Sequence, residues 1–174
     1  MKKLFLVAIA TVGFTFTGTA QEVTFGVKGG VNNTNFTGDL PSDPKTSFYV
    51  GGFVDLGITE AFHIQPELLY SSEGSADDMG VTYLKVPVML KYYAAPGFNI
   101  QAGPYLGFKM ATEDDLFDEA IKSMDFGVGV GAGYDLANGL FFDARYNLGL
   151  MDISEVDGVE IKNSGIQAGV GYRF

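Results

Sequence analysis

Apolar and polar residues alternate along most of the chain, so that apolar side chains share one face of each run. Eight runs have this pattern: residues 23–32, 47–57, 62–71, 81–93, 98–110, 124–136, 140–150 and 163–174. A period of two is typical of β-strands with two unlike faces, and we find no convincing helical period after residue 22. The pattern therefore predicts eight strands.

The segments between these runs alternate in length. Residues 33–46, 72–80, 111–123 and 151–162 form long connections, whereas 58–61, 94–97 and 137–139 are short. An up-and-down antiparallel sheet with two unlike ends explains this alternation, because a parallel sheet needs a crossover helix in each connection. We expect an all-β fold, an eight-stranded antiparallel up-and-down barrel.

Alternation alone leaves open which face points inward. A soluble, lipocalin-like barrel has its apolar face inside, and an outer-membrane barrel has it outside. The apolar face carries most of the aromatic residues, whereas the polar face is rich in glycine. The interior of eight strands is just wide enough for side chains to fill, and each run has the roughly 9–11 residues that cross a bilayer. We therefore predict a transmembrane barrel with the polar face inside.

Charged residues of the eight runs all fall on the polar face, with both signs in near balance. Buried charges must be paired, and this set can pair with itself. The predicted interior network consists of Lys28, Asp55, Glu67, Lys85, Lys91, Asp125, Asp135, Asp143, Arg145 and Arg173, with Lys109 on the same face.

The stretch MDFGVGVGAGYDL (124–136) formally satisfies the relaxed dinucleotide motif G-x-G-x-x-A at Gly127, Gly129 and Ala132. A phosphate-binding turn must lead into a helix, but here the period of two continues through the motif. We interpret its four glycines as the inward face of a strand. We therefore expect Gly131→Ser to reduce the stability of the protein less than Val130→Arg does. These glycines leave room for long side chains such as Tyr49, Tyr105 or Arg145.

Three prolines, Pro66, Pro87 and Pro104, lie inside predicted strands. Proline cannot donate to the hydrogen-bond ladder and belongs at edges or bulges. We expect bulges or strand ends close to these positions.

Residues 1–20 read as a cleaved signal peptide, which leaves residues 21–174 as one barrel domain. Lys2 and Lys3 precede an apolar stretch, and small residues stand at Gly18 and Ala20. The alternative, a membrane anchor helix, needs roughly 20 apolar residues, more than this stretch offers. The chain has no cysteine, so no disulfide staples it.

The formal net charge is −10, and −12 once Lys2 and Lys3 are removed. Nucleic acid requires a basic face, so it is not an expected partner.

Several segments resemble a family of small outer-membrane β-barrels, often labelled porin-family or PorT-like. These are QPELLYS (65–71), YLKVPVMLKYY (83–93), GPYLGF (103–108), GVGVGAGYDL (127–136), YNLGL (146–150) and GVGYRF (169–174). The resemblance implies the outer membrane of a Gram-negative bacterium, with the lipid bilayer and lipopolysaccharide as partners, and hints at a role in protein secretion. It transfers no active site. The last strand, with Tyr172 and the terminal Phe174, also looks like the signal that barrel-assembly machinery reads.

Candidate chemistry is sparse. The only histidine, His63, is expected at the short-connection end, away from the acidic long loops, so a hydrolytic site at the extracellular rim lacks its base. We expect no enzyme, no cofactor and no metal site. The long loops hold much of the acid: Asp39, Asp43, Glu73, Asp77, Asp78, the run EDDLFDE (113–119), Asp152, Glu155, Asp157 and Glu160. A divalent cation bridging to lipopolysaccharide is an open alternative, although DISEVDGVE (152–160) lacks the ligand spacing of an EF-hand.

The sequence thus predicts a monomeric, non-enzymatic envelope protein with a structural or surface-interaction role through acidic extracellular loops. A narrow channel along the glycine face and a PorT-like accessory role in secretion remain alternatives. A soluble periplasmic binder fits least.

Overall fold

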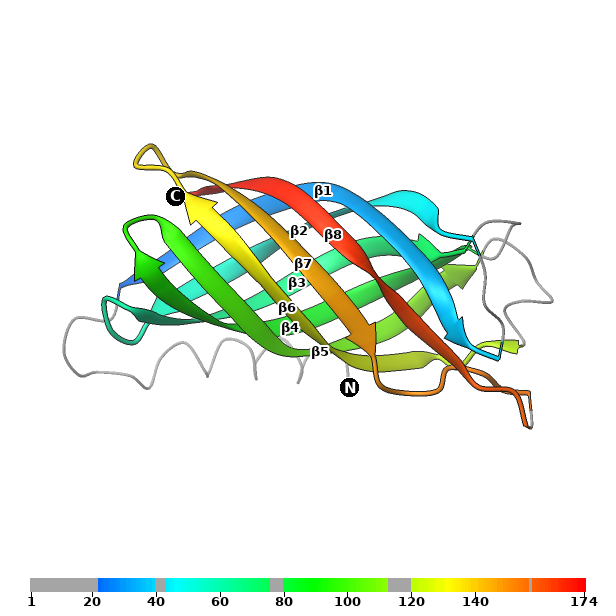
Figure 1. The fold of residues 1–174 in the computed structure, drawn as a ribbon. Helices are drawn as coiled ribbons and strands as arrows, with labels where there is room; N and C mark the ends of the chain where they lie inside the picture. Colours follow the sequence, from blue (N-terminus) through cyan, green and yellow to red (C-terminus); the bar gives the residue numbers. More distant parts are fainter. Residues whose placement is uncertain (1–21, 40–42, 76–79, 113–119, 157) are drawn as a thin grey trace, which may run out of the picture.

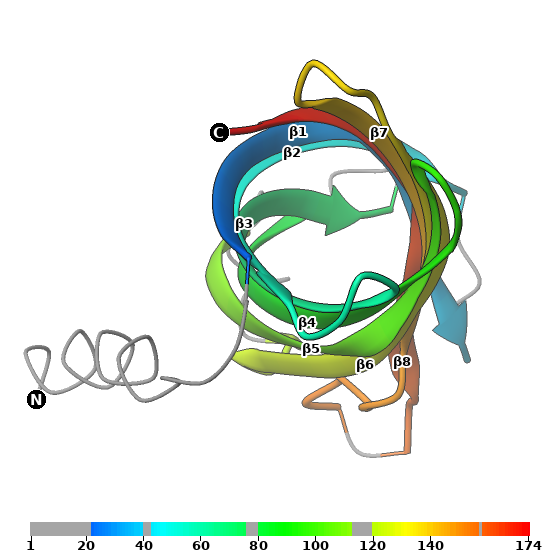
Figure 2. The ribbon, with the colours of Figure 1, turned by 90° about the vertical axis from the view of Figure 1, so that its left-hand side faces the viewer.

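The protein forms a closed barrel of eight antiparallel strands in the computed structural model, which describes residues 22–39, 43–75, 80–112, 120–156 and 158–174. The strands are β1 (Val23–Gly38), β2 (Lys45–Gly57), β3 (Phe62–Gly74), β4 (Gly80–Ala95), β5 (Phe98–Thr112), β6 (Met124–Asp135), β7 (Leu140–Gly149) and β8 (Ile161–Arg173). Each strand pairs with the next, and β8 returns to β1 (Figures 1 and 2). The predicted fold class is confirmed.

The apolar face of the strands forms the outer wall. In β2, for example, Phe48 and Val50 are more than half exposed, whereas Tyr49 between them is buried. An apolar surface that encircles a whole molecule is far larger than the patches that a soluble protein exposes. The wall is the lipid-facing surface of a transmembrane barrel, and the polar face is its interior.

Several strands extend beyond the predicted runs at the long-loop end. The prediction ended the first strand at residue 32, but β1 continues to Gly38 and stays in register with β8. The outward residues there are polar: Asn35 accepts a hydrogen bond from Ser164 at 3.1 Å, and Asn33 donates one to Thr46 at 3.1 Å. Backbone pairing therefore continues where the apolar pattern stops, so the barrel extends past its apolar belt.

The two ends of the barrel differ. Tight turns at 58–61, 96–97 and 136–139 close one end, and Gly97 and Gly139 take positive φ angles there (76° and 89°) that suit glycine. Glu22 and Phe174, the first and last described residues, also lie at this short-turn end, which faces the viewer in Figure 2. Residues 39–44, 75–79, 113–123 and 150–160 connect the strands at the other, long-loop end.

The prediction of bulges at the three prolines was wrong. The register is the same on both sides of Pro66, Pro87 and Pro104, although pairing is interrupted for two residues beside them. The irregularities lie elsewhere on β4, between residues 82 and 83 and between 93 and 95. A proline thus removes its ladder bond here without adding a residue to the strand.

The predicted signal peptide, residues 1–20, lies outside the described residues. In the described part of the chain, no helix is long and apolar enough to cross a membrane.

Candidate functional site: the polar lumen and its vestibule

A balanced cluster of four charges fills the middle of the lumen. The Arg145 guanidinium makes two hydrogen bonds to the Glu67 carboxylate, at 2.7 and 2.5 Å, and lies 3.1 Å from Asp143. Lys28 donates to Asp143, and its ammonium is 3.7 Å from Glu67. All four side chains are buried, so two cations and two carboxylates compensate each other away from solvent. We call these residues the central cluster.

Amides surround the central cluster and occupy further hydrogen-bonding positions, while Nε of Arg145 stays without a partner. Gln101 accepts from Arg145 at 2.9 Å, and Gln65 donates to Glu67 at 2.7 Å. Lys91 in turn donates to the oxygen of Gln65 at 3.1 Å. These amides, on β3 and β5, connect charges on β3, β4 and β7 into one network.

A second group of charges lies toward the long-loop end. Lys85 pairs with Glu73 at 2.6 Å, and its ammonium also lies over the ring of Tyr105, 4.1 Å from the centroid. Asp125 is fully buried and accepts hydrogen bonds from Asn163 at 3.1 Å and from Tyr105 at 3.3 Å. In this group Lys85 is paired with Glu73, whereas Asp125 is held by uncharged donors.

An apolar cluster closes the lumen above these charges. It comprises Phe36, Val81, Tyr83, Ile121, Ile153 and Ile161, with Val159 packed against it. The cluster brings the ends of β1, β4 and β8 together with residues of two long connections, and we call it the apolar cap. A bridge between Ile121 and Ser154 joins these connections to each other.

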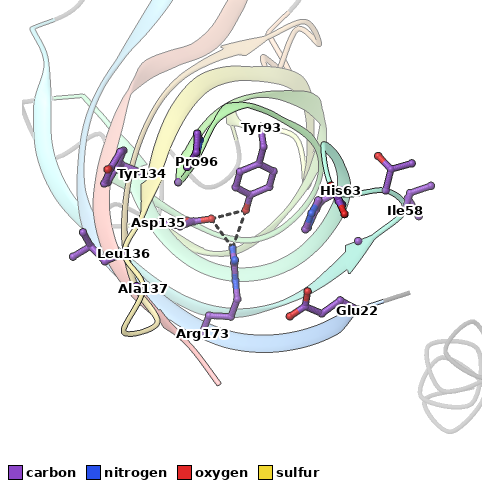
Figure 3. Close-up of a pocket in the computed structure, with 14 residues that line it drawn as sticks. Glu22, Ile58, His63, Tyr93, Pro96, Tyr134, Asp135, Leu136, Ala137 and Arg173 are labelled. Atoms are coloured by element: carbon purple, nitrogen blue, oxygen red, sulfur yellow. Dashed lines mark hydrogen bonds and ion pairs between the residues drawn. The ribbon is translucent and has the colours of Figure 1, made fainter. Parts of the chain in front are cut away.

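A third polar group lies at the short-turn end. Arg173 reaches Asp55 at 3.2 Å. It also reaches Asp135 at 3.2 Å, and Tyr93 donates to Asp135 at 2.5 Å (Figure 3). His63 contacts Asp55 through Nδ1 at 2.5 Å, and its ring lies 4.7 Å from that of Tyr93. This mouth cluster, Asp55, His63, Tyr93, Asp135 and Arg173, is partly open to solvent, unlike the central cluster.

Cavity volumes follow this layering. A cavity of about 860 Å³, which we call the vestibule, opens at the short-turn end over the mouth cluster. Mid-lumen, beside Met89, Gly129 and Arg145, the void measures only about 10 Å³. Such a space holds one water molecule at most.

Glycines make space for the large interior side chains, as the sequence indicates, but with different partners. On β6, Gly127 lies under the Tyr105 hydroxyl and Gly131 under the Arg145 side chain, which is the expected arrangement. Tyr49 packs against Gly169 of β8 instead of a β6 glycine. A side chain at Gly131 would also meet the Ala144 carbonyl oxygen, so Gly131→Ser carries a steric cost as well. That this cost is smaller than the cost of Val130→Arg stays a prediction.

The structure places the ten residues of the predicted interior network inside the barrel. Asp135 and Arg173 are half-buried at the mouth, and the other eight are buried. They divide among three groups, and Lys91 joins the central cluster to the mouth cluster through Gln65 and Asp55. Asp125 accepts its hydrogen bonds from uncharged partners. Tyr172 and Phe174 lie at the exposed end of the chain, with ring centroids 5.4 Å apart.

Sequence reasoning missed Glu73, which it assigned to a solvated loop. Glu73 lies on β3 and is buried against Lys85. The signal was present, because Glu67, Ser71 and Glu73 keep one parity along the strand. The predicted interior network also left out uncharged polar residues of the same face, including Asn32, Gln65, Gln101 and Gln167.

His63 lies at the short-turn end, away from the described acids of the long loops, but it does have a carboxylate partner in Asp55. No hydroxyl is hydrogen-bonded to this pair among the described residues. Within the same part of the chain, no three His, Cys, Asp or Glu side chains converge to hold a metal ion.

The described long loops carry a second open cavity of about 480 Å³, lined by acids and one lysine, Lys122. Asp152 organises this region: backbone N–H groups of Ile161 and Ser154 donate to its carboxylate at 2.9 and 3.0 Å. These two hydrogen bonds, with Lys122 at 3.6 Å, lower the pKa of Asp152. Of the predicted loop acids, Asp77, Asp78, the run 113–119 and Asp157 lie outside the described residues.

Comparison with known structures shows the same fold at low sequence identity. Neisserial surface protein A is 14% identical with a TM-score of 0.55, and Ail, the attachment invasion locus protein of Yersinia pestis, is 14% identical with a TM-score of 0.56. Each match covers 88% of this chain and 99% of the other. A second structure of Ail, in complex with the heparin analogue sucrose octasulfate, has a TM-score of 0.50 at 14% identity, with the same coverage.

No curated protein matches the sequence significantly. The model of one family, described as outer membrane protein beta-barrel domain, matches residues 19–155, which is most of the chain. That family and the barrel's lipid-facing wall agree on the bacterial outer membrane as its location. The chain belongs to the outer membrane protein β-barrel domain family.

Proposed function

We propose that this protein is a monomeric, non-enzymatic envelope protein that acts through its acidic long-loop face and does not conduct solutes. The observation that carries the proposal is the closed middle of the lumen, where the void is only about 10 Å³. Ions and nutrients need a continuous wet path, and an eight-stranded barrel filled by its own side chains has none.

Two different kinds of closure support this proposal. The central cluster fills the lumen with paired charges, and the apolar cap closes it again toward the long loops. The one polar side-chain group of the apolar cap is the Tyr83 hydroxyl, which already accepts a hydrogen bond from Asn163 at 3.3 Å. Because the cap otherwise offers only hydrocarbon to a hydrated ion, loss of charge in the central cluster alone leaves the path closed. The alternative of a narrow channel along the glycines of β6 is disfavoured, since these glycines lie under interior side chains.

The long-loop face has a clear electrostatic character. Asp39, Asp43 and Glu155 are exposed on it, and its cations are engaged, with Lys162 paired to Glu160 at 2.5 Å and Lys122 near Asp152. This face repels polyanions, so a ligand like the heparin analogue bound to Ail is not expected here. Cationic partners are favoured, among them divalent cations shared with the phosphates of lipopolysaccharide.

Two experiments test the proposal. In planar bilayers, reconstituted protein should give no steady openings, and regular unitary currents would refute closure. For the surface role, a deletion strain is complemented with wild type, with Asp39→Asn/Glu155→Gln, or with Glu60→Gln at the other end as the matched control. We expect wild type and the control to restore resistance to EDTA and detergent, and the loop variant to fail. Full rescue by the loop variant would refute a role for the acidic face.

A further inference from the structure

We propose that the vestibule is a binding site for an organic cation, an alkylammonium or guanidinium group carried on an aliphatic body. This inference concerns the short-turn end and is independent of the role proposed for the long loops. It follows from the shape of the cavity, the hydrogen-bonding groups on its floor and the charges on its rim (Figure 3).

The vestibule is a blind cavity. Its volume of about 860 Å³ lies within the range of roughly 300–1,000 Å³ that is usual for sites of small ligands. Its floor is the mouth cluster, and beyond it the lumen narrows to a void of about 10 Å³. A molecule that enters must leave by the same opening, which is the geometry of a binding pocket.

The floor contains one acceptor and one donor that have no hydrogen-bond partner, and both atoms are buried. Asp135 uses Oδ2 for both Tyr93 and Arg173, which leaves Oδ1 without a partner. The His63 ring lies beside Gly57 on the wall, with Nδ1 in contact with Asp55 at 2.5 Å. The unpartnered donor on the floor is Nε of Arg173. An N–H group of a ligand that reaches the floor would give Oδ1 of Asp135 the partner it lacks.

The positive charges of the floor are paired with carboxylates. Arg173 is shared between Asp55 and Asp135 at 3.2 Å each, and Lys91 lies 3.6 Å from Asp55. Two cations and two carboxylates thus cancel, so the floor does not attract an anion. Glu22 and Glu60, which are exposed on the rim, then give the vestibule a net charge of −2.

Apolar side chains supply the rest of the lining. Ile58, Pro96 and Ala137 line the cavity together with the two glutamates. They can contact the methylene groups of a ligand while its charged end approaches the carboxylates, the combination that fits an alkylammonium better than a metal ion.

The test is calorimetric titration of the barrel in nanodiscs of zwitterionic lipid with 1,5-diaminopentane. Pentane-1,5-diol, which has the same length and no charge, is the ligand control. The variant is Glu22→Gln/Glu60→Gln. Glu155→Gln/Glu160→Gln removes the same charge from the acidic long-loop face and separates binding in the vestibule from cation binding at that face. These four glutamates are exposed, and the shift in gel mobility on heating verifies that each variant folds.

We expect saturable binding of the diamine, no binding of the diol, at least tenfold weaker binding by the vestibule variant, and unchanged binding by Glu155→Gln/Glu160→Gln. The inference is overturned if the diamine does not bind, if the diol binds equally well, or if the vestibule variant matches wild type.

A second ligand, the peptide acetyl-Ala-Lys-Ala-Lys-Ala-amide, identifies the source of the cation in the cell. Tighter binding of the peptide than of the diamine, lost in the vestibule variant, assigns the site to a lysine-bearing periplasmic protein. Tighter binding of the diamine assigns it to a free polyamine. Binding of either ligand that does not depend on the rim glutamates refutes the site.

Discussion

Charge balance in the central cluster can be tested by a double-mutant cycle on Glu67 and Arg145. Glu67→Gln leaves Arg145 and Lys28 facing Asp143 alone, a buried excess of one positive charge. Arg145→Met leaves Glu67 and Asp143 with only Lys28, an excess of one negative charge. Removal of one partner of a buried pair costs about 3–5 kcal/mol, so we expect each single variant to lose that much free energy of unfolding.

The double variant should behave differently from the sum of the two. With both groups neutral, Lys28 and Asp143 remain as a balanced pair. The double variant should then cost no more than either single variant, instead of the roughly 6–10 kcal/mol that additivity requires. The coupling free energy is therefore expected to be about 3–5 kcal/mol in favour of the pair.

The measurement is equilibrium urea unfolding from lipid vesicles, followed by circular dichroism and by gel mobility without boiling. The control cycle uses Glu160→Gln and Lys162→Met, an exposed pair at an equal contact distance of 2.5 Å, whose coupling should stay below about 1 kcal/mol. Additive losses at Glu67 and Arg145, or single losses below about 1 kcal/mol, would show that water reaches the cluster and that its charges are not truly buried.

Three further predictions concern the wall, the glycines and the loops. Val130→Arg on the lipid-facing side should cost about 2–4 kcal/mol in the same unfolding assay, and a smaller loss would contradict a position at the membrane centre. Gly131→Ala should be more destabilising than Gly129→Ala, because the added methyl meets backbone at the first site and only the mobile end of Asn147 at the second; the reverse order would contradict these contacts. The depressed pKa of Asp152 means that its stabilisation of the loop is present above the pKa of the unfolded chain and is lost as pH falls through the lower, folded value. Limited proteolysis should thus cleave the 150–160 loop faster in acid, and Asp152→Asn should cleave equally fast at neutral pH.

The outer wall could be predicted from the sequence because lipid imposes a strict requirement on each residue. A side chain that faces hydrocarbon must be apolar, so the period of two marks strand, face and membrane together. The same requirement explains the failure at the strand ends. Asn33 and Asn35 face water above the belt, where pairing with β8 needs backbone groups and makes no demand on hydropathy. Backbone pairing between β1 and β8 therefore continues beyond the alternation of apolar and polar residues from which the strands were predicted.

The interior was predictable as a set but not as pairs. The alternation along each strand predicts that Lys28 and Asp143 point inward. Their contact, however, joins β1 to β7 across 115 positions of the sequence. That contact depends on the stagger of the closed barrel, which no local pattern records. Glu73 shows a different error. It continues the inward alternation of β3, but its charge led us to place it in a loop. The vestibule was missed for a similar reason, since its residues come from three turns and both ends of the described chain.

Successive layers of the lumen are closed by different interactions. Water enters the vestibule, paired charges and amides fill the middle, and the apolar cap excludes water at the long-loop end. A pore would need its narrowest layer to be wet and its charges to be unpaired or mobile, whereas here each charged group of the central cluster has a partner of opposite sign. Side chains on the surface at the two ends can be changed without disturbing these layers. For this reason the long-loop face and the vestibule, and not a path between them, are where this barrel can recognise other molecules.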